Sequence, residues 1–393
     1  MNVAKTVYKK LGKWLVFSFL LAFPFGQLIS FDFSFYGYSP NLHLIDLIAG
    51  ASFILAICAG LKRPSIFSHF KNFFVLALFS LFLSVFYFPL SEVAFGSFYF
   101  IRLIFWGYFF VLVWNLLKDG LIDKGTLIKS LIAVSVTSAI YGWIQYIFIP
   151  DLRSLFYIGW DDHYYRLAGT FLDPGFMGIV AVFGFLASFA YFLESKKKSY
   201  LLLSLFLLLT LAFTYSRASY LALITGSVYL IFKANKIRKA YLFVIAFLML
   251  LPFLPRPAGE GVRLERVHSI YAKAGNYSQT IKIIKNYPLL GVGYNNICSV
   301  RIRMFNDEFD SHSCAGSDSS LLLVLATTGT VGFLAFIKLI YEVWAQSKRK
   351  FYGSLFLISL VAVLTHSLFV NSLFYPWVLG WLLVLLPTAV GES

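Results

Sequence analysis

The chain has 393 residues, of which 59% are hydrophobic, 19% aromatic and only 13% charged. A soluble domain is about a quarter charged, so this composition excludes an ordinary water-facing surface and indicates a protein that lives among membrane lipids. The net charge of +15 comes from lysine clusters between apolar runs, where basic residues set membrane orientation, so we expect no nucleic-acid partner.

Apolar runs of roughly 15 to 24 residues separate the basic clusters, which is the pattern of helices that cross a bilayer. The sequence predicts one all-α polytopic membrane domain over residues 1–393, with about 12 transmembrane helices. The predicted spans, in chain order, are 14–29, 44–61, 73–90, 93–117, 131–149, a span that ends at 196–198, two short spans on either side of 215–217, 241–254, a span from 318 to just before 348, and two spans joined by the turn 371–377.

The basic residues predict the orientation of these spans. Each segment that we place inside, apart from the carboxyl tail, carries at least three basic residues, whereas the short outside loops carry none or one. This pattern puts both termini in the cytoplasm and residues 255–317, between spans nine and ten, in one large extracytoplasmic (periplasmic) loop. The preference for basic residues on the cytoplasmic side applies to short loops, so a long translocated loop can carry cations. We expect these cations to have an anionic partner.

Arg217 lies in a turn that the span lengths place below the outer surface. Only 34 residues separate Lys198 from Lys233, whereas two full spans need about 40. A charge at that depth usually pairs with a substrate or a counter-ion, which favours function over an arginine that snorkels to the headgroups. Arg102, inside the fourth span, supports a weaker version of this argument, since it can simply pair with Asp46.

The extracytoplasmic loop has three features of its own. We expect Arg263 and Arg266 on one face of a short helix, where two guanidinium groups suit a pyrophosphate. Residues 277–287 predict a helix that either lies on the outer leaflet or packs on its neighbours in the loop. The glycines of GVGYNN, at 291–296, indicate a tight turn and not a dinucleotide fingerprint, because the third glycine and a preceding strand are missing.

The sequence offers no metal centre and no cofactor site. The six histidines and the acidic residues show no metal-ligand spacing. No DxD pair for a metal-bound nucleotide sugar lies in a cytoplasmic loop, so we expect a donor that needs no metal.

The cysteines predict one disulfide. Cys298 and Cys314 both fall in the outer loop, where an oxidising compartment favours bridging. Cys58 lies in the second span and cannot join them. Two free thiols are the alternative.

Four segments, in this order, carry a resemblance to a known family. They are RLAGTFLDPGFMG at 166–178, TYSRAS at 214–219, the run from Arg263 that ends in PLLGVGYNN at 296, and SDSSLLLVLATTGTVGF at 317–333. Over about residues 166–332 the chain resembles the O-antigen ligase and polymerase family, membrane glycosyltransferases that use sugars carried on undecaprenyl pyrophosphate.

The resemblance implies an inverting, metal-independent glycosyl transfer on the outer face of the bacterial inner membrane. Its donor would be a glycan linked to undecaprenyl pyrophosphate, and its acceptor a second lipid-linked glycan or the lipid A core. Arg217, with Arg263 and Arg266, would hold the pyrophosphate and stabilise its developing charge. The further candidate substrate-binding residues are Arg166, Arg102, Asn295 and His312.

Three positions depart from the family's pattern. Gly175 stands where asparagine is common, and counting back from the closing glycines places the ligase histidine on Asp318 and its asparagine on Ser319. This departure favours a polymerase, with a ligase that transfers the glycan to the lipid A core as the alternative, and Asp318 is the candidate base that activates the acceptor hydroxyl. Asp318 is equally suited to cap the helix of the tenth span, and one residue can do both.

A lipid-linked oligosaccharide flippase is the alternative from another class, because about twelve spans with both ends inside is also a transporter layout. Transporters usually show matched halves and polar groups spread along several helices. Here the polar residues are concentrated in one outer loop and no internal repeat is evident. This distribution favours the enzyme.

Overall fold

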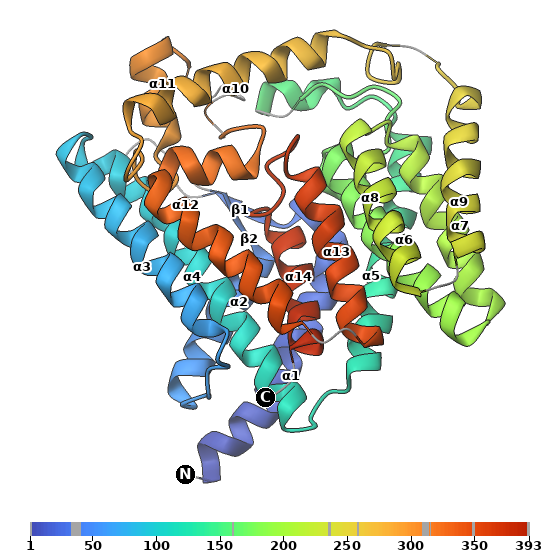
Figure 1. Cartoon of the computed structure of the whole chain (residues 1–393), viewed down its shortest axis with the longest axis horizontal. Helices are drawn as coiled ribbons and strands as arrows, with labels where there is room; N and C mark the ends of the chain where they lie inside the picture. Colours follow the sequence, from blue (N-terminus) through green and yellow to red (C-terminus); the bar gives the residue numbers. More distant parts are fainter. Residues whose placement is uncertain are drawn as a thin grey trace.

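The computed structural model describes residues 2–32, 41–158, 161–234, 237–257, 259–308, 314, 316–347 and 350–390. Within these ranges the chain is mainly helical, with one two-stranded antiparallel sheet, short 3-10 helices and irregular connecting loops. The all-α fold predicted from the sequence is confirmed. Figure 1 shows the long helices side by side in one bundle, with both termini at one end and α10 and α11 at the other.

The bundle is built from the apolar helices of both halves of the chain. In order they are α1 (Asn2–Ala22), α2 (Leu44–Cys58), α3 (Phe67–Leu83), α4 (Leu90–Lys118), α5 (Lys124–Phe148), α6 (Pro174–Ser195), α7 (Lys198–Phe213), α8 (Arg217–Ala234), α9 (Ile237–Leu250), α12 (Ser320–Gln346), α13 (Phe351–His366) and α14 (Pro376–Ala389).

Shorter elements connect and cover the bundle. They are β1 (Ser30–Asp32), which pairs with β2 (Asn41–His43), the helices α10 (His268–Asn286) and α11 (Ile297–Phe305), and the 3-10 helices Phe23–Leu28, Ser84–Phe86, Arg153–Ile158, Gly169–Phe171 and Leu251–Phe253.

Six segments in the described ranges are long and apolar enough to cross a membrane by length and composition. They are Val7–Leu28, Phe67–Phe86, Leu90–Lys118, Lys124–Phe148, Pro174–Ser195 and Ser320–Gln346. The other bundle helices are apolar but shorter. The count of about 12 spans and the outside position of residues 255–317 therefore stay predictions.

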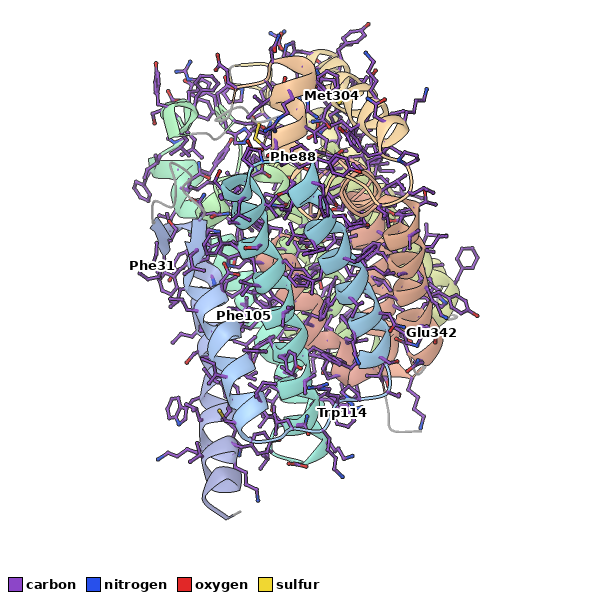
Figure 2. All side chains as sticks on the ribbon, turned by 90° about the vertical axis from the view of Figure 1, so that its left-hand side faces the viewer. Phe31, Phe88, Phe105, Trp114, Met304 and Glu342 are labelled. Carbon is purple, nitrogen blue, oxygen red and sulfur yellow. A yellow bond between two sulfur atoms is a disulfide. The ribbon has the colours of Figure 1, made fainter. Side chains whose placement is uncertain are left out.

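The outer surface of the bundle is apolar, as a lipid environment requires. Large hydrophobic side chains such as Leu21, Phe82 and Phe148 are 75%, 61% and 76% exposed. Figure 2 shows side chains along the whole length of α4, with Phe105 part-way along it and Trp114 near the end opposite Met304 of α11. A soluble protein would bury such residues, so this surface supports a membrane protein.

The centre of the bundle is α6, whose apolar window is 83% buried. Its glycines allow close approach to two neighbours. A Cβ added at Gly178 would lie 2.3 Å from Ser219 Oγ of α8, and one added at Gly184 would lie 2.1 Å from Ser135 Oγ of α5. This close packing fixes the first turn of α8 against the first turn of α6.

Two of the family-like segments dock on each other at a kink in α12. Gly329 has a φ of 64° inside the helix, and a Cβ there would lie 2.3 Å from the carbonyl oxygen of Leu289. The N–H of Val292 donates to Ala326 O at 3.0 Å, and Gly291 has a φ of 69°. The glycines therefore serve a tight turn and close backbone approach, which fixes the loop against α12 at its kink.

The helix predicted at 277–287 is the second half of α10. One face of α10 packs on neighbouring helices, as the second alternative from the sequence expects. This face contacts α12, and its buried side chains are Asn276, Thr280 and Ile283. Ile281 is on the exposed side. The helix begins at His268, before the predicted start. The sequence pattern does not predict this first half because it is polar and shows no apolar periodicity.

Candidate active site

A cavity of about 1290 Å³ lies at the end of the bundle that carries α10 and α11. Its volume exceeds the ~300–1,000 Å³ of ordinary small-molecule pockets, so it suits a large substrate. Four segments that carry the family resemblance contribute to its wall. The charged and histidine side chains of the lining are Arg102, Arg166, Arg217, Arg266, Lys273, Asp161, Asp173, Asp318, His43 and His163.

The turn between α7 and α8 presents a backbone carbonyl to two arginines. Tyr215 adopts the left-handed conformation, with a φ of 50°, which is uncommon for a bulky residue and marks a strained turn. Nη2 of Arg166 and Nη2 of Arg266 both donate to the Tyr215 carbonyl oxygen, at 3.4 and 3.3 Å. Nε of Arg166 also donates to Thr214 O at 3.1 Å. The turn therefore holds guanidinium groups from two separate loops.

Arg217 is the first residue of α8 and is held by the loop that precedes α10. Its Nη1 donates to the carbonyl oxygens of Arg266, at 3.0 Å, and Leu264, at 3.3 Å. Its Nη2 donates to Ser269 Oγ at 2.6 Å. The Arg217 side chain, which the span lengths place below the outer surface, is thus partly buried and points toward residues 264–269.

Arg266 lines the cavity, but Arg263 does not. The predicted short helix is a series of turns, so the two arginines do not share a face, and this prediction was wrong. Nη1 of Arg266 donates to the carbonyl oxygens of Gly261 and Arg263, both at 2.9 Å. The side chain of Arg266 is therefore folded back into the cavity, whereas that of Arg263 is exposed to solvent.

Arg166, Arg217 and Arg266 form what we call the arginine cluster. In the part of the chain that the structure describes, none of the three makes an ion pair with a carboxylate. Burial, together with the charges of the other two arginines, lowers the pKa of Arg266 to about 10. Burial also lowers the pKa of Arg166. Three cations held by neutral acceptors leave a site that an anion would neutralise.

Arg102 and Asn295 lie in other parts of the same cavity wall. Arg102 pairs with the buried Asp46, with Nη2 at 3.2 Å from Oδ2, and also donates to Asn41 O. The ion pair with Asp46, which the sequence leaves open, is present in the structure, and it balances the charge of Arg102. Asn295 has a φ of 61°, which asparagine tolerates better than most residues.

Asp318 lies in the cavity wall beside Lys273. Its Oδ1 is 3.3 Å from the Lys273 ammonium, and its backbone N–H donates to Asn276 Oδ1 at 3.0 Å. The residue that caps α12 is Ser319, whose hydroxyl accepts from the N–H of Leu322 at 3.5 Å. The interpretation of Asp318 as the helix cap was wrong, because the helix begins one residue later than that interpretation requires.

A comparison with protein-family models finds a match for part of the chain. Residues 202–337 match the family model described as O-Antigen ligase. This match confirms the resemblance to the O-antigen ligase and polymerase family. No curated protein matches the chain.

The matched residues 202–337 include Arg217, Arg266 and Asp318, whereas Arg166 precedes them. The fold therefore extends the site beyond the matched residues. The family implies a membrane-bound, glycosyltransferase-like enzyme that works with lipid-linked glycans and partners of the lipid A core type.

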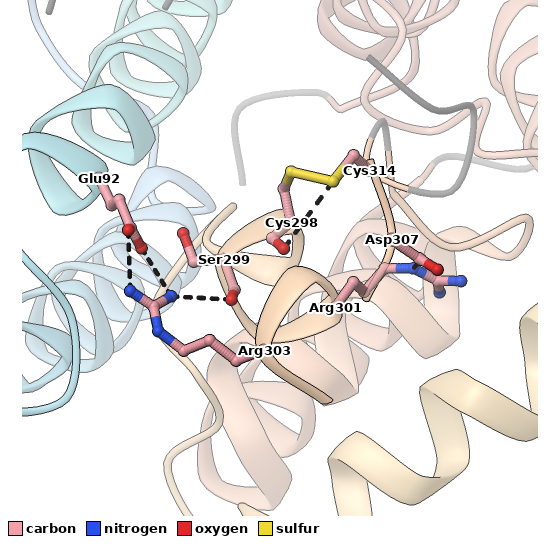
Figure 3. Close-up of a disulfide and its surroundings, with 7 residues drawn as sticks. All are labelled: Glu92, Cys298, Ser299, Arg301, Arg303, Asp307 and Cys314. Carbon is pink, nitrogen blue, oxygen red and sulfur yellow. Dashed lines mark hydrogen bonds and ion pairs between the residues drawn. A yellow bond between two sulfur atoms is a disulfide. The ribbon is translucent and has the colours of Figure 1, made fainter. Parts of the chain in front are cut away.

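Cys298 and Cys314 are joined by a disulfide in the structure, with their Cα atoms 4.3 Å apart. Figure 3 shows this bond linking α11 to the chain that leads toward α12. Both cysteines line the cavity, so the bond is part of its wall. Cys58 is a free, exposed cysteine. His312, the remaining candidate from the sequence, lies outside the described residues.

Helix α11 is also anchored to the ends of α3 and α4. Arg303 donates to both carboxylate oxygens of Glu92, at the start of α4, and each bond measures 2.8 Å (Figure 3). Nδ2 of Asn296 donates to Ser84 Oγ at 2.8 Å. These contacts hold the wall of the cavity in which Asn295 stands.

Three residues that the sequence did not single out meet beside the arginine cluster. The ligand-type atoms of Asp161, His163 and Asp173 all lie within 4.8 Å of one another, so they could hold a metal ion. The spacing of 161, 163 and 173 matches no metal motif, and the fold closes the gap by bringing the start of α6 back to the preceding loop.

Asp173 is a charged group at this junction. Burial raises the pKa of its carboxyl, but the neighbouring His163 side chain, the hydrogen bond from the N–H of Phe176 and the charge of Arg166 outweigh burial and hold the pKa well below its usual range. One signal could have found it, since Asp followed by Pro is typical of a helix N-cap and its first residue.

Proposed function

We propose that the chain is a polymerase of O-antigen or a related surface polysaccharide that acts at the outer face of the cytoplasmic membrane. It transfers a glycan from an undecaprenyl-pyrophosphate donor to a second lipid-linked glycan, with inversion and without a metal ion. The observation that carries the proposal is the arginine cluster, three cations in one large cavity with no carboxylate paired to them in the described residues.

The arginine cluster suits the leaving group of this reaction. As the bond between the anomeric carbon and the phosphate oxygen breaks, negative charge grows on the pyrophosphate. Arg217 and Arg266 are fixed by backbone carbonyls and can therefore meet that charge without reorganising. Arginine suits the task because its planar fork binds a phosphate through two parallel hydrogen bonds.

The acceptor hydroxyl must lose a proton as the new glycosidic bond forms. Asp318 is the candidate base, since it lines the same cavity as the cluster and its carboxylate is not spent on capping α12. The ammonium group of Lys273, 3.3 Å from Oδ1, holds this carboxylate at the cavity wall. The bond to the acceptor oxygen forms as undecaprenyl pyrophosphate leaves with the electron pair.

The ligase is the second candidate, because the matching family model is described as O-Antigen ligase. The polymerase is favoured because Asp318 stands where the resembled ligases have histidine. A lipopolysaccharide gel of a deletion strain separates the two. A band with a single repeat indicates a lost polymerase, whereas bare core with accumulated lipid-linked polymer indicates a lost ligase and contradicts the proposal.

A further inference from the structure

His163 stands between Arg166 and Asp173 in the wall of the cavity. Its Nδ1 lies 3.5 Å from Arg166 Nη1, and its Nε2 lies 3.7 Å from Asp173 Oδ2. The histidine is only 5% exposed, and Nε2 has no hydrogen-bond partner among the described residues. The ring therefore lies between a guanidinium and a carboxylate and keeps the two from direct contact.

The neighbour of Nδ1 determines which ring nitrogen carries the proton. A guanidinium group can only donate, so Nδ1 must accept from Arg166 and the proton of the neutral ring is on Nε2, facing Asp173. A metal ion at Nε2 would need the lone pair that this proton occupies. The contact of Nδ1 with Arg166 thus favours a ring that spaces the guanidinium from the carboxylate over a metal site.

Asp173 is held in place independently of this ring. As the N-cap of α6, its Oδ1 accepts from the N–H groups of Gly175, at 2.6 Å, and Phe176, at 2.9 Å. The other oxygen, Oδ2, is the one that faces His163. A fixed negative charge therefore lies one imidazole ring away from a cation of the arginine cluster.

We propose that His163 is a positioning residue that links Arg166 to Asp173 while keeping the two from forming an ion pair, so that Arg166 stays available to the donor pyrophosphate. This inference rests on the proposed function, since it takes the arginine cluster as the pyrophosphate site. Without the ring, Arg166 loses an acceptor, and Asp173 competes with the pyrophosphate for the guanidinium group.

The test measures binding of undecaprenyl pyrophosphate to the purified full chain in detergent, together with KM and kcat for the lipid-linked donor. His163→Ala should weaken binding by about 10-fold and raise KM, with kcat little changed, because one hydrogen bond to a charged group is lost. His163→Asn should stay within about 3-fold of the wild type, since its amide oxygen can take the place of Nδ1 as an acceptor.

Variants of Asp173 test the inference more directly. Asp173→Asn keeps a good N-cap and should bind undecaprenyl pyrophosphate as tightly as the wild type or more tightly. The double variant His163→Ala with Asp173→Asn should regain most of the affinity that His163→Ala loses. His268→Ala is the matched control, because that histidine is exposed and does not line the cavity.

The outcomes that overturn the inference are distinct. Wild-type binding by His163→Ala, or a double variant as weak as the single one, contradicts it. So does wild-type binding that falls in EDTA and returns with Mg²⁺, which would show a metal site. If Arg166→Ala binds as tightly as the wild type, the proposed pyrophosphate site itself fails. Should His163→Ala not fold, His163→Asn and Asp173→Asn carry the test.

Discussion

Arg166 and Arg266 meet at one acceptor, the carbonyl oxygen of Tyr215, with their Nη2 atoms at 3.4 and 3.3 Å. One arginine precedes α6 and the other precedes α10, so two distant loops bring like charges to one strained turn. Such an arrangement costs folding free energy that a bound anion returns.

Inorganic pyrophosphate should therefore raise the midpoint of thermal unfolding. At about 100 times its Kd, a ligand stabilises the folded state by about 2.7 kcal/mol, which is a shift of a few degrees. Arg266→Gln should abolish most of this shift and change the midpoint of the ligand-free protein little, because the relief of repulsion between neighbouring charges offsets the lost hydrogen bonds to backbone carbonyls. A variant that keeps the full shift would show that Arg266 does not meet the anion.

Arg217→Ala should abolish glycan transfer while the protein still accumulates in the membrane. Arg217→Lys should restore little activity, because an ammonium group cannot reproduce the fork that binds phosphate. The matched control is Arg263→Ala, since that side chain is exposed and outside the cavity. Rates of polymer formation by the purified variants decide the matter, and full activity of Arg217→Ala would remove Arg217 from the site.

Substitutions of Asp318 and Ser319 should have different effects, the first on the rate of polymerisation and the second on stability. Asp318→Asn cannot accept a proton, so it should slow polymerisation by about 100-fold, near the lower end for general bases, with an unchanged unfolding midpoint. Ser319→Ala should lose about 1 kcal/mol of stability as the cap is removed and keep its activity. A wild-type rate for Asp318→Asn would assign the base elsewhere, and His312 is then the next residue to test.

The bond between Cys298 and Cys314 should be present in protein purified without reductant. Mass spectra of unreduced peptides should show these two cysteines linked and only Cys58 alkylated, as the internal control. Replacing both by serine should destabilise the loop by up to about 3 kcal/mol, the entropic estimate for a closed loop of this length, and make α11 more sensitive to proteolysis. Two alkylated thiols would contradict the disulfide.

The orientation in the membrane can be tested by cysteine labelling in a background that lacks the natural cysteines. An impermeant reagent should label Arg263→Cys on intact cells whose outer membrane is permeable, because residues 255–317 are predicted to lie outside. Lys118→Cys lies at the end of α4 away from α11 and should react only after lysis. The reverse pattern would invert the topology and with it the side on which the reaction takes place.

The sequence predicts the helical fold well, because apolar runs and lysine clusters have a strong periodic signal. It predicts the cavity only in part. Span depth predicts Arg217 and the resemblance predicts Arg166. The sequence does not distinguish Arg263 from Arg266, since the turns of the loop decide which of the two side chains points into the cavity. His163 was missed because only the tertiary fold brings it to Asp173, which is ten residues later. The capping assignment failed by one residue, within the usual uncertainty of a helix end.

The most direct measurement uses the purified protein with undecaprenyl-pyrophosphate-linked repeat units as the sole substrate, with no lipid A core present. The account predicts a ladder of lipid-linked polymers of increasing length, formed in the presence of EDTA and absent with Arg217→Ala. If no polymer forms, and glycan is transferred only when lipid A core is added, the protein is a ligase and the central claim is wrong.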